Sequence, residues 1–316
     1  MRVFLITVAA IIGLVISAFL YFSNPDIPRA TLEAKYATPP SQFVQLDDGA
    51  RAHVRDRGPR DAPAIVLIHG NMLSLFSWEP WAGRLDDTFR VVTLDLPGHG
   101  LTGAVPSGDY TQKGMVEFVR MVADKLGLGR FAIAGHSMGG GIAARFAETY
   151  PQRVAALILV DSVGMPSKPP DPQPWIFRLL RVPVLNQVLL HITPRSLVAQ
   201  NLDGLTVRKG VITDAVIDQY WDFVRMAGTR KATFVRFGLP RNTYVRDHIA
   251  AVHAPTLILW GAEDPDIPVA DAHLYGKAIS GSKLLIYADT GHFTHEEVPD
   301  QSAADARAFL LAWNKP

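Results

Sequence analysis

The chain has 316 residues, 48% of them hydrophobic, so it is long enough to bury a large core. Its 31 Lys and Arg residues are balanced by 30 Asp and Glu residues, and no basic block points to a nucleic-acid partner or a polybasic lipid site. Because the chain has no cysteine, disulfides, thiolate metal sites, a Cys nucleophile and a lipid-modified Cys are excluded.

The N-terminal residues predict a membrane anchor. The run from Val3 to Phe22 is largely apolar and uncharged, and about twenty such residues can cross a bilayer as a helix. A cleaved signal peptide is the alternative, but the run is long and lacks a clear small-residue cleavage site. Arg2 favours an extracytoplasmic domain, whereas Arg29 and Lys35 favour the opposite orientation. We expect a single-pass transmembrane signal-anchor over residues 1–22.

The next segment predicts a linker and then a β-hairpin. Residues 23–40 are polar and contain four prolines, which is typical of a spacer that holds a domain off the bilayer. Residues 43–46 and 51–55 alternate between apolar and polar, and Asp48-Gly49 lies between them.

Short apolar runs without alternation predict a sheet whose strands are buried on both faces. They lie at residues 64–68, 90–94, 131–134, 154–160, 256–260 and 284–287. Helical periodicity at residues 115–126 and 138–150 separates some of them. Strands that alternate with helices imply a mostly parallel, doubly wound α/β sheet. We assign residues 41–162 and 254–316 to this core.

Residues 163–253 interrupt the alternation and predict a helical lid, because ligands of such sheets bind beyond the carboxyl ends of the strands. A structural embellishment is the alternative. Helical patterns cover residues 175–180, 184–190 and 213–226, and Thr213 or Asp214 can cap the last of these. The large apolar side chains of the lid either line an apolar pocket or simply bury the lid itself: Trp175, Phe177, Leu179, Leu189, Trp221 and Phe223.

Ser137 is the predicted nucleophile. It is the centre of Gly135-His136-Ser137-Met138-Gly139, which matches G-x-S-x-G after an apolar strand and before a helix. This strand-turn-helix context exposes the hydroxyl at a helix N-terminus, where the helix dipole favours developing negative charge. An ordinary serine in a glycine-rich turn is the alternative.

His292 is the predicted base, since a serine hydroxyl is a weak nucleophile without one. Gly291-His292 follows the sixth apolar run, at a strand end on the same edge as Ser137. His295, at the start of an expected helix over residues 296–313, is the nearby alternative.

Asp264 is the predicted acid that orients the imidazole. It follows the fifth run in a loop that ends at Pro268. Asp161 also ends a strand at this edge and is the main alternative, with Asp266 and Glu263 behind it.

The negative oxygen of a tetrahedral intermediate needs N–H donors. We expect one from the backbone of Met138, after the nucleophile, and one from Asn71, in the loop after the first core strand.

Five motifs in this order resemble the α/β-hydrolase superfamily over roughly residues 41–316: Leu67-Ile68-His69-Gly70, Asp95-Leu96-Pro97-Gly98-His99-Gly100, Gly135-His136-Ser137-Met138-Gly139-Gly140, Trp260-Gly261-Ala262-Glu263-Asp264 and Gly291-His292. The apolar N-terminus and residues 74–81 resemble membrane-anchored bacterial members. His69-Gly70-Asn71 is similar to haloalkane dehalogenases, but those carry Asp followed by Trp where this chain has Ser137 and Met138.

The resemblance implies a serine hydrolase that cleaves a fairly apolar, small-molecule carboxylic ester without metal or organic cofactor. A carbon–carbon bond hydrolase of ring-fission products uses the same triad and stays open. A membrane-tethered binding protein with this fold is a further alternative. The natural ester, the acyl length and the oligomeric state stay undetermined.

Overall fold

Eight strands form one sheet in the order β1-β2-β4-β3-β5-β6-β7-β8. The computed structural model describes residues 1, 4, 6–7, 13–14, 17, 19, 23–166, 191–239 and 244–313. The strands are β1 (Ser41–Gln45), β2 (Arg51–Arg57), β3 (Ala64–Ile68), β4 (Arg90–Leu94), β5 (Phe131–His136), β6 (Val154–Val160), β7 (Thr256–Gly261) and β8 (Lys283–Tyr287).

The strand directions agree with the sequence pattern. β1 and β2 pair antiparallel as the predicted hairpin, and β2 joins the sheet antiparallel to β4. All further neighbours, from β4 to β8, are parallel. The six predicted unalternated runs are confirmed as strands to within two residues at either end. The carboxyl ends of β3, β5, β6, β7 and β8 therefore meet at one edge.

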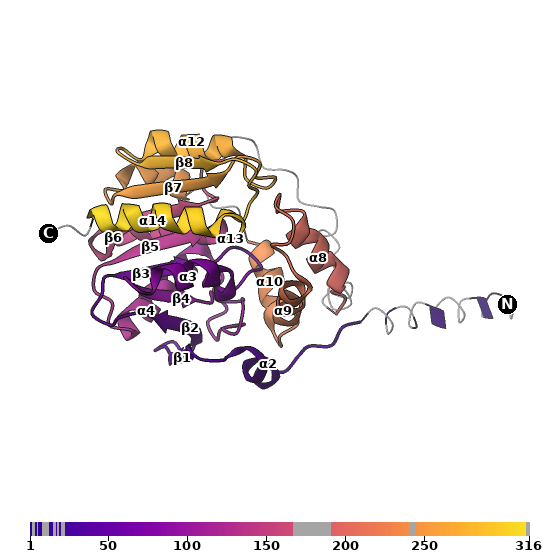
Figure 1. Cartoon of the computed structure of the whole chain (residues 1–316). Helices are drawn as coiled ribbons and strands as arrows, with labels where there is room; N and C mark the ends of the chain where they lie inside the picture. Colours follow the sequence, from indigo (N-terminus) through magenta and orange to yellow (C-terminus); the bar gives the residue numbers. More distant parts are fainter. Residues whose placement is uncertain are drawn as a thin grey trace.

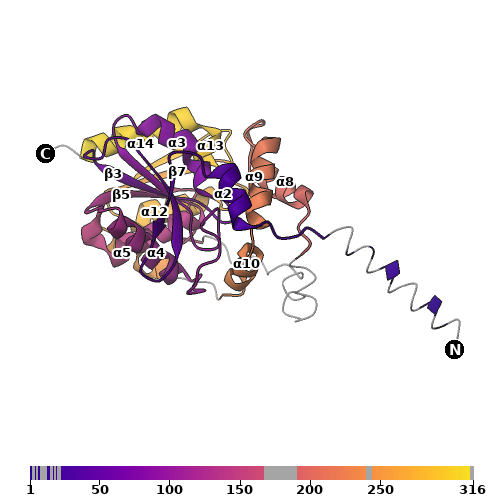
Figure 2. The same cartoon turned by 90° about the horizontal axis from the view of Figure 1, so that it is seen from below.

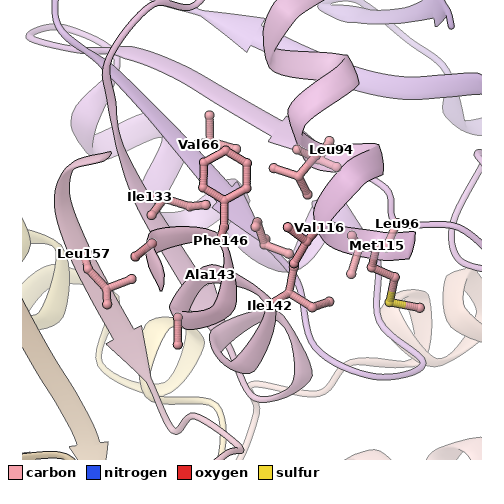
Figure 3. Packing of buried hydrophobic residues seen from close by; sticks show 14 of the residues in the cluster. Val66, Leu94, Leu96, Met115, Val116, Ile133, Ile142, Ala143, Phe146 and Leu157 are labelled. Atoms are coloured by element: carbon pink, nitrogen blue, oxygen red, sulfur yellow. The ribbon is translucent and has the colours of Figure 1, made fainter. Parts of the chain in front are cut away.

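Helices cover both faces of the sheet, and Figure 2 shows the three layers. One face carries α3 (Glu79–Leu85) and α14 (Pro299–Trp313), and the other carries α4 (Gln112–Lys125), α5 (Met138–Thr149) and α12 (Val269–Ala278). The buried residues accordingly form two clusters, one on each face of the sheet. On the α4–α5 side, Val66 and Ile133 of the sheet pack against Phe146 of α5 (Figure 3).

The described part of the insertion between β6 and β7 is helical, as predicted. Its described helices are α8 (Arg195–Asp203), α9 (Asp214–Val224), α10 (Thr229–Phe237) and α11 (Tyr244–His248). α8, α9 and α10 lie together beside the sheet (Figure 1). Thr213 caps α9, because its hydroxyl oxygen accepts from the Val216 N–H at 3.3 Å. The predicted helices at residues 175–180 and 184–190 lie outside the described residues.

The segment predicted as a plain linker, residues 23–40, contains a helix. Residues 29–36 form α2 (Arg29–Tyr36), and Leu32 is only 1% exposed. Leu32 and Tyr36 are four residues apart, so they share a helical face that packs on the lid. The Arg29 guanidinium donates to the carbonyl oxygens of Leu101 and Thr102 at 2.9 and 2.8 Å. The polar, proline-rich composition of this segment gave no sign of the apolar contacts that Leu32 and Tyr36 make with the lid.

The predicted anchor over residues 1–22 lies mostly outside the described residues. Among the residues that are described, no helix has both the length and the apolar character needed to cross a membrane.

The expected helix over residues 296–313 is divided in two. α13 (Thr294–Glu297) ends before Val298, and α14 begins at Pro299. Proline has no N–H to continue the helical ladder, so the break follows from Pro299 itself. His295 lies within α13.

We predict opposite effects for the same substitution at two helical glycines. A Cβ on Gly140 of α5 would lie 2.3 Å from the Ser162 hydroxyl oxygen, whereas a Cβ on Gly83 of α3 meets nothing within 4 Å. Gly140→Ala should lower the free energy of unfolding by about 1–3 kcal/mol through overpacking. Gly83→Ala should raise it by about 0.5–1 kcal/mol. Urea unfolding followed by circular dichroism measures both, and equal effects at the two sites would contradict the close packing of α5.

Candidate active site

Ser137 lies in a sharp turn between β5 and α5. Its backbone has φ 52° and ψ −119°, a region that non-glycine residues seldom adopt and that costs about 1–3 kcal/mol. The turn is held by its own hydrogen bonds: the Ser137 N–H donates to the Val160 carbonyl at 3.0 Å, and the Ser137 carbonyl accepts from Val163 at 3.1 Å. The backbone around the serine is therefore fixed by the neighbouring strand β6.

Ser137 and His292 line the same cavity, which has a volume of about 450 Å³. Their residues are 6% and 2% exposed, so both are enclosed rather than on an open surface. The described lining consists of Asn71, Met72, Leu73, His136, Ser137, Asn201, Leu202, Leu205, Phe237, Asp266, His292 and Phe293. The core loops thus supply the polar groups, and the lid supplies mainly apolar ones.

His292 is paired with Asp264. Its Nδ1–H donates to Asp264 Oδ2 at 2.7 Å, and Asp264 Oδ1 accepts from the N–H groups of Asp266 and Ile267 at 2.8 and 2.9 Å. Burial lowers the pKa of His292, but the hydrogen bond and charge of Asp264, helped by Asp161, outweigh it. The net result is a raised pKa. Because Nδ1 is hydrogen-bonded to Asp264, Nε2 is the ring nitrogen that can exchange a proton with a group in the cavity.

Asp161, the rival acid, holds backbone and hydroxyl groups in place. Its Oδ1 accepts from the Gly261 N–H at 2.9 Å and from the Thr294 hydroxyl at 3.0 Å, and its Oδ2 accepts from the Thr294 N–H at 3.1 Å. It therefore ties the end of β6 to the end of β7 and to α13. Of the two predicted acids, Asp264 is the one hydrogen-bonded to His292.

His295, the rival base, is packed in an aromatic stack. Its ring lies 4.3 Å from that of Trp78 and 4.5 Å from that of His136, and burial lowers its pKa to about 3. His136, which sequence reasoning did not single out, donates from Nε2 to the His292 carbonyl at 2.8 Å. His136 thus holds the backbone of His292 in place. The G-x-S-x-G pattern allows any residue before the serine, so it gives no signal for this role.

Of the two predicted oxyanion donors, Asn71 shares a cavity with Ser137 and Met138 follows Ser137 in the chain. Asn71 lines the cavity, and Met138 is the first residue of α5, so its N–H has no partner within the helix. Met72 has φ 58°, a strained value that sets the path of the loop after Asn71. Arg236, which the sequence did not single out, donates from Nη1 to Asn71 Oδ1 and lies 3.4 Å from Met138 Sδ.

Asp95 fixes the loop that carries Asn71. Its oxygens accept from the Leu75 and Leu101 N–H groups at 2.7 and 2.8 Å and from His53 Nδ1 at 2.6 Å. The side chain is fully buried. Asp95 therefore fixes the loops next to the cavity without lining the cavity itself.

Of the six large apolar lid side chains named from the sequence, Trp221 and Phe223 lie among the described residues, and neither lines the cavity. Phe223 is 3% exposed and packs edge-on against Tyr36 of α2, with ring centroids 5.0 Å apart. Trp221 donates from Nε1 to the Thr193 carbonyl at 2.7 Å. Trp175, Phe177, Leu179 and Leu189 lie outside the described residues.

Within the described part of the chain, no group of three or more His, Asp or Glu side chains is placed to hold a metal ion.

Known proteins share this architecture. Residues 63–189 match the family described as alpha/beta hydrolase fold. An uncharacterized protein of Mycobacterium tuberculosis is 30% identical over 279 residues, which cover 83% of this chain and 78% of that protein. A 2-hydroxy-6-oxononadienedioate/2-hydroxy-6-oxononatrienedioate hydrolase of Klebsiella pneumoniae is 27% identical and covers 82% of this chain and 92% of that enzyme.

Two solved structures resemble the whole chain. One, described as a membrane phospholipase A and bacterial virulence factor, has a TM-score of 0.74 and 26% identity, with 100% of both chains covered. A putative lipase from Acinetobacter baumannii has a TM-score of 0.74 and 26% identity, covering 92% of this chain and 98% of that one.

We predict that Asp264→Asn lowers the pKa of His292. The substitution removes the hydrogen bond to a carboxylate and its charge, both of which raise this pKa, while burial, which lowers it, stays. The pKa can be followed by NMR titration of the His292 Cε1–H. Asp266→Asn is the matched control, because its carboxylate lies 3.7 Å from Nε2 and raises the pKa of His292 less than Asp264 does. A larger drop in the control would show that Asp264 is not the dominant partner.

Proposed function

Because the chain belongs to the α/β-hydrolase fold family, we propose that it hydrolyses carboxylic esters through an acyl intermediate on Ser137. The observation that carries the proposal is the arrangement of the cavity. Ser137 and His292 both line it, and His292 Nδ1 is hydrogen-bonded to Asp264 at 2.7 Å. The raised pKa of His292 suits a group that must accept a proton and then return it.

In the proposed reaction, His292 Nε2 takes the proton of Ser137 as Oγ attacks the ester carbonyl carbon. The tetrahedral intermediate places its negative oxygen at the N–H groups of Met138 and Asn71. The carbon–oxygen bond of the ester then breaks, and His292 gives its proton to the leaving alcohol. Water attacks the acyl-serine in the same way, with His292 as base, and releases the acid and free Ser137.

The cavity favours an apolar ester. Leu73, Leu202, Leu205, Phe237 and Phe293 supply apolar surface, and the described lining contains no Lys or Arg. The charged group in the lining is Asp266, which would repel a nearby substrate carboxylate. Because the similar whole-chain structure is described as a membrane phospholipase A, glycerophospholipid esters are the first natural substrates to test.

Carbon–carbon bond hydrolysis is the second candidate. It is supported by the 27% identity to the Klebsiella pneumoniae dienedioate hydrolase. The described lining offers the two carboxylates that this name implies no Lys or Arg side chain as a direct partner. A non-catalytic tethered binding protein is a weaker third, since the Ser137, His292 and Asp264 side chains are all present at one site.

We also propose that residues 1–22 anchor the enzyme as a single-pass helix, with the hydrolase domain on the extracytoplasmic side. The uncharged run from Val3 to Phe22 supports the anchor, and Arg2 supports the orientation.

We predict that a fluorophosphonate probe labels the wild-type protein and that Ser137→Ala abolishes labelling. Asp264→Asn should slow turnover of p-nitrophenyl esters on the order of 10³–10⁴-fold, because the imidazole loses its oriented tautomer. Ser107→Ala, at an exposed serine, is the matched control and should behave as wild type. The same preparations should be assayed on esters of increasing acyl length and on a ring-fission dienoate. Equal labelling of Ser137→Ala, or turnover of the dienoate alone, would contradict the ester mechanism.

We predict that the full chain, made in a bacterial host, stays with membranes after a carbonate wash, and that a chain starting at residue 23 is released. Residues 23–40 must be kept, because they contact the lid. Protease digestion of spheroplasts tests the orientation, since an extracytoplasmic domain is cut in intact spheroplasts. Release of the full chain by carbonate would contradict the anchor.

A further inference from the structure

One guanidinium from the lid contacts both residues that are expected to supply the oxyanion donors. Arg236, near the end of α10, donates from Nη1 to the side-chain oxygen of Asn71. The same Nη1 lies 3.4 Å from Met138 Sδ. Asn71 follows β3 and Met138 opens α5, so the lid residue bridges two separate segments of the core.

This guanidinium is enclosed, and no carboxylate of the described residues pairs with it. Burial lowers the pKa of Arg236 to about 10, which leaves it charged at neutral pH, and no acidic group contributes to the shift. Its Nη2 is buried and, among the residues that the structure describes, has no hydrogen-bond partner. An enclosed cation without a counter-ion is unfavourable for folding. Its position is therefore poorly explained by stability.

Among the residues that the structure describes, the groups around Arg236 do not compensate its charge. The pKa values of His69 and His99 are lowered first by burial, and the charge of Arg236 adds to the effect. His69 uses both ring nitrogens locally, with Nδ1 donating to the Gly70 carbonyl at 2.7 Å and Nε2 accepting from the Leu96 N–H at 3.0 Å. The neutral imidazoles add no negative charge, so the positive potential of Arg236 extends toward Asn71 and Met138.

Contacts along α10 fix its backbone and therefore the position of Arg236 beside Asn71 and Met138. Ala232, one turn earlier on the same face, is buried against Gly98, where an added Cβ would lie 3.2 Å from the Ala232 Cβ. At the start of the helix, Arg230 donates from Nε to Asp26 Oδ1 at 3.1 Å and from Nη2 to the Asn24 carbonyl at 2.6 Å.

We propose that Arg236 is a positioning residue for the oxyanion site. Through its contacts with Asn71 and Met138 it directs the two backbone N–H donors toward the position of the negative oxygen, and its charge adds positive potential there. This proposal rests on the proposed function, because it assigns a role within the same reaction. The side chain acts on the transition state, where negative charge develops, and contributes little to binding of the neutral ester.

We predict that Arg236→Met lowers kcat for p-nitrophenyl butyrate about 10- to 100-fold and leaves KM within about threefold, because a displaced donor weakens transition-state stabilisation only. The melting temperature should stay equal or rise, because an enclosed, unpaired cation is removed. Arg236→Lys should recover part of kcat, and its behaviour decides the question if the Met variant does not fold. Lys231→Met removes an exposed cation from the same helix and should match wild type.

A double-mutant cycle separates positioning from general damage. Asn71→Ala keeps its backbone N–H but loses the oxygen that Arg236 binds, so it should reduce kcat to a similar degree as Arg236→Met. The double variant should be no more than about threefold slower than either single variant, because both remove the same contact. Fluorophosphonate labelling should slow in parallel, since phosphonylation also develops negative charge on oxygen.

Three results would overturn the proposal: an Arg236→Met kcat equal to wild type, a rise in KM with kcat unchanged, or fully multiplicative effects in the cycle. In each of these cases the wild type still turns over esters and is labelled, so the proposed function survives. A wild type that neither turns over an ester nor reacts with the probe would remove both proposals.

Discussion

The close approach of the α5 N-terminus to the carboxyl ends of the sheet is the constraint on which the site depends. A Cβ on Gly135 would lie 2.1 Å from the Gly139 carbonyl oxygen, and a Cβ on Gly139 would lie 2.3 Å from that of Ile68. Only glycine allows the helix to begin so near the strands. The same approach forces the backbone of Ser137 to φ 52° and turns its side chain toward the cavity. The strain is maintained because β5 and β6 are buried on both faces and α5 packs closely against them.

Three aspartates at this edge of the sheet show how environment divides similar side chains among roles. Asp95 and Asp161 are fully buried, and their oxygens accept mainly from backbone N–H, hydroxyl and imidazole groups that define loops. Asp264 uses one oxygen in the same way and keeps the other for His292. A carboxylate that is held by one oxygen and directed by the other is suited to orient an imidazole. Asp95 and Asp161, whose oxygens both accept hydrogen bonds from other groups, instead stabilise the loops around the imidazole.

The segment before the core connects the N-terminal part of the chain to the lid. Ile27 forms a parallel bridge with Met226, and Lys35 and Tyr36 both donate to Asp222 Oδ2 at 2.7 and 2.8 Å. These contacts join α2 and Ile27 to α9 and to Met226 after it, and α9 in turn packs against α8, which carries Leu202 into the cavity. Residues 27–36 thus lie against the lid, so the lid is fixed from outside as well as from the core.

The sequence alone determined where the strands lie along the chain, the serine turn and the candidate residues, because these depend on local signals: unalternated apolar runs, glycines at fixed spacing, and motifs at strand ends. The order of the strands within the sheet came from the structure. The sequence did not decide between Asp264 and Asp161 as the acid, since both follow strands at one edge. Only the tertiary structure shows which carboxylate is hydrogen-bonded to the imidazole. The sequence missed α2, His136 and Arg236, whose contacts join residues about 70 to 190 positions apart. Such contacts leave no periodicity in the chain, because they arise only when separate elements pack together.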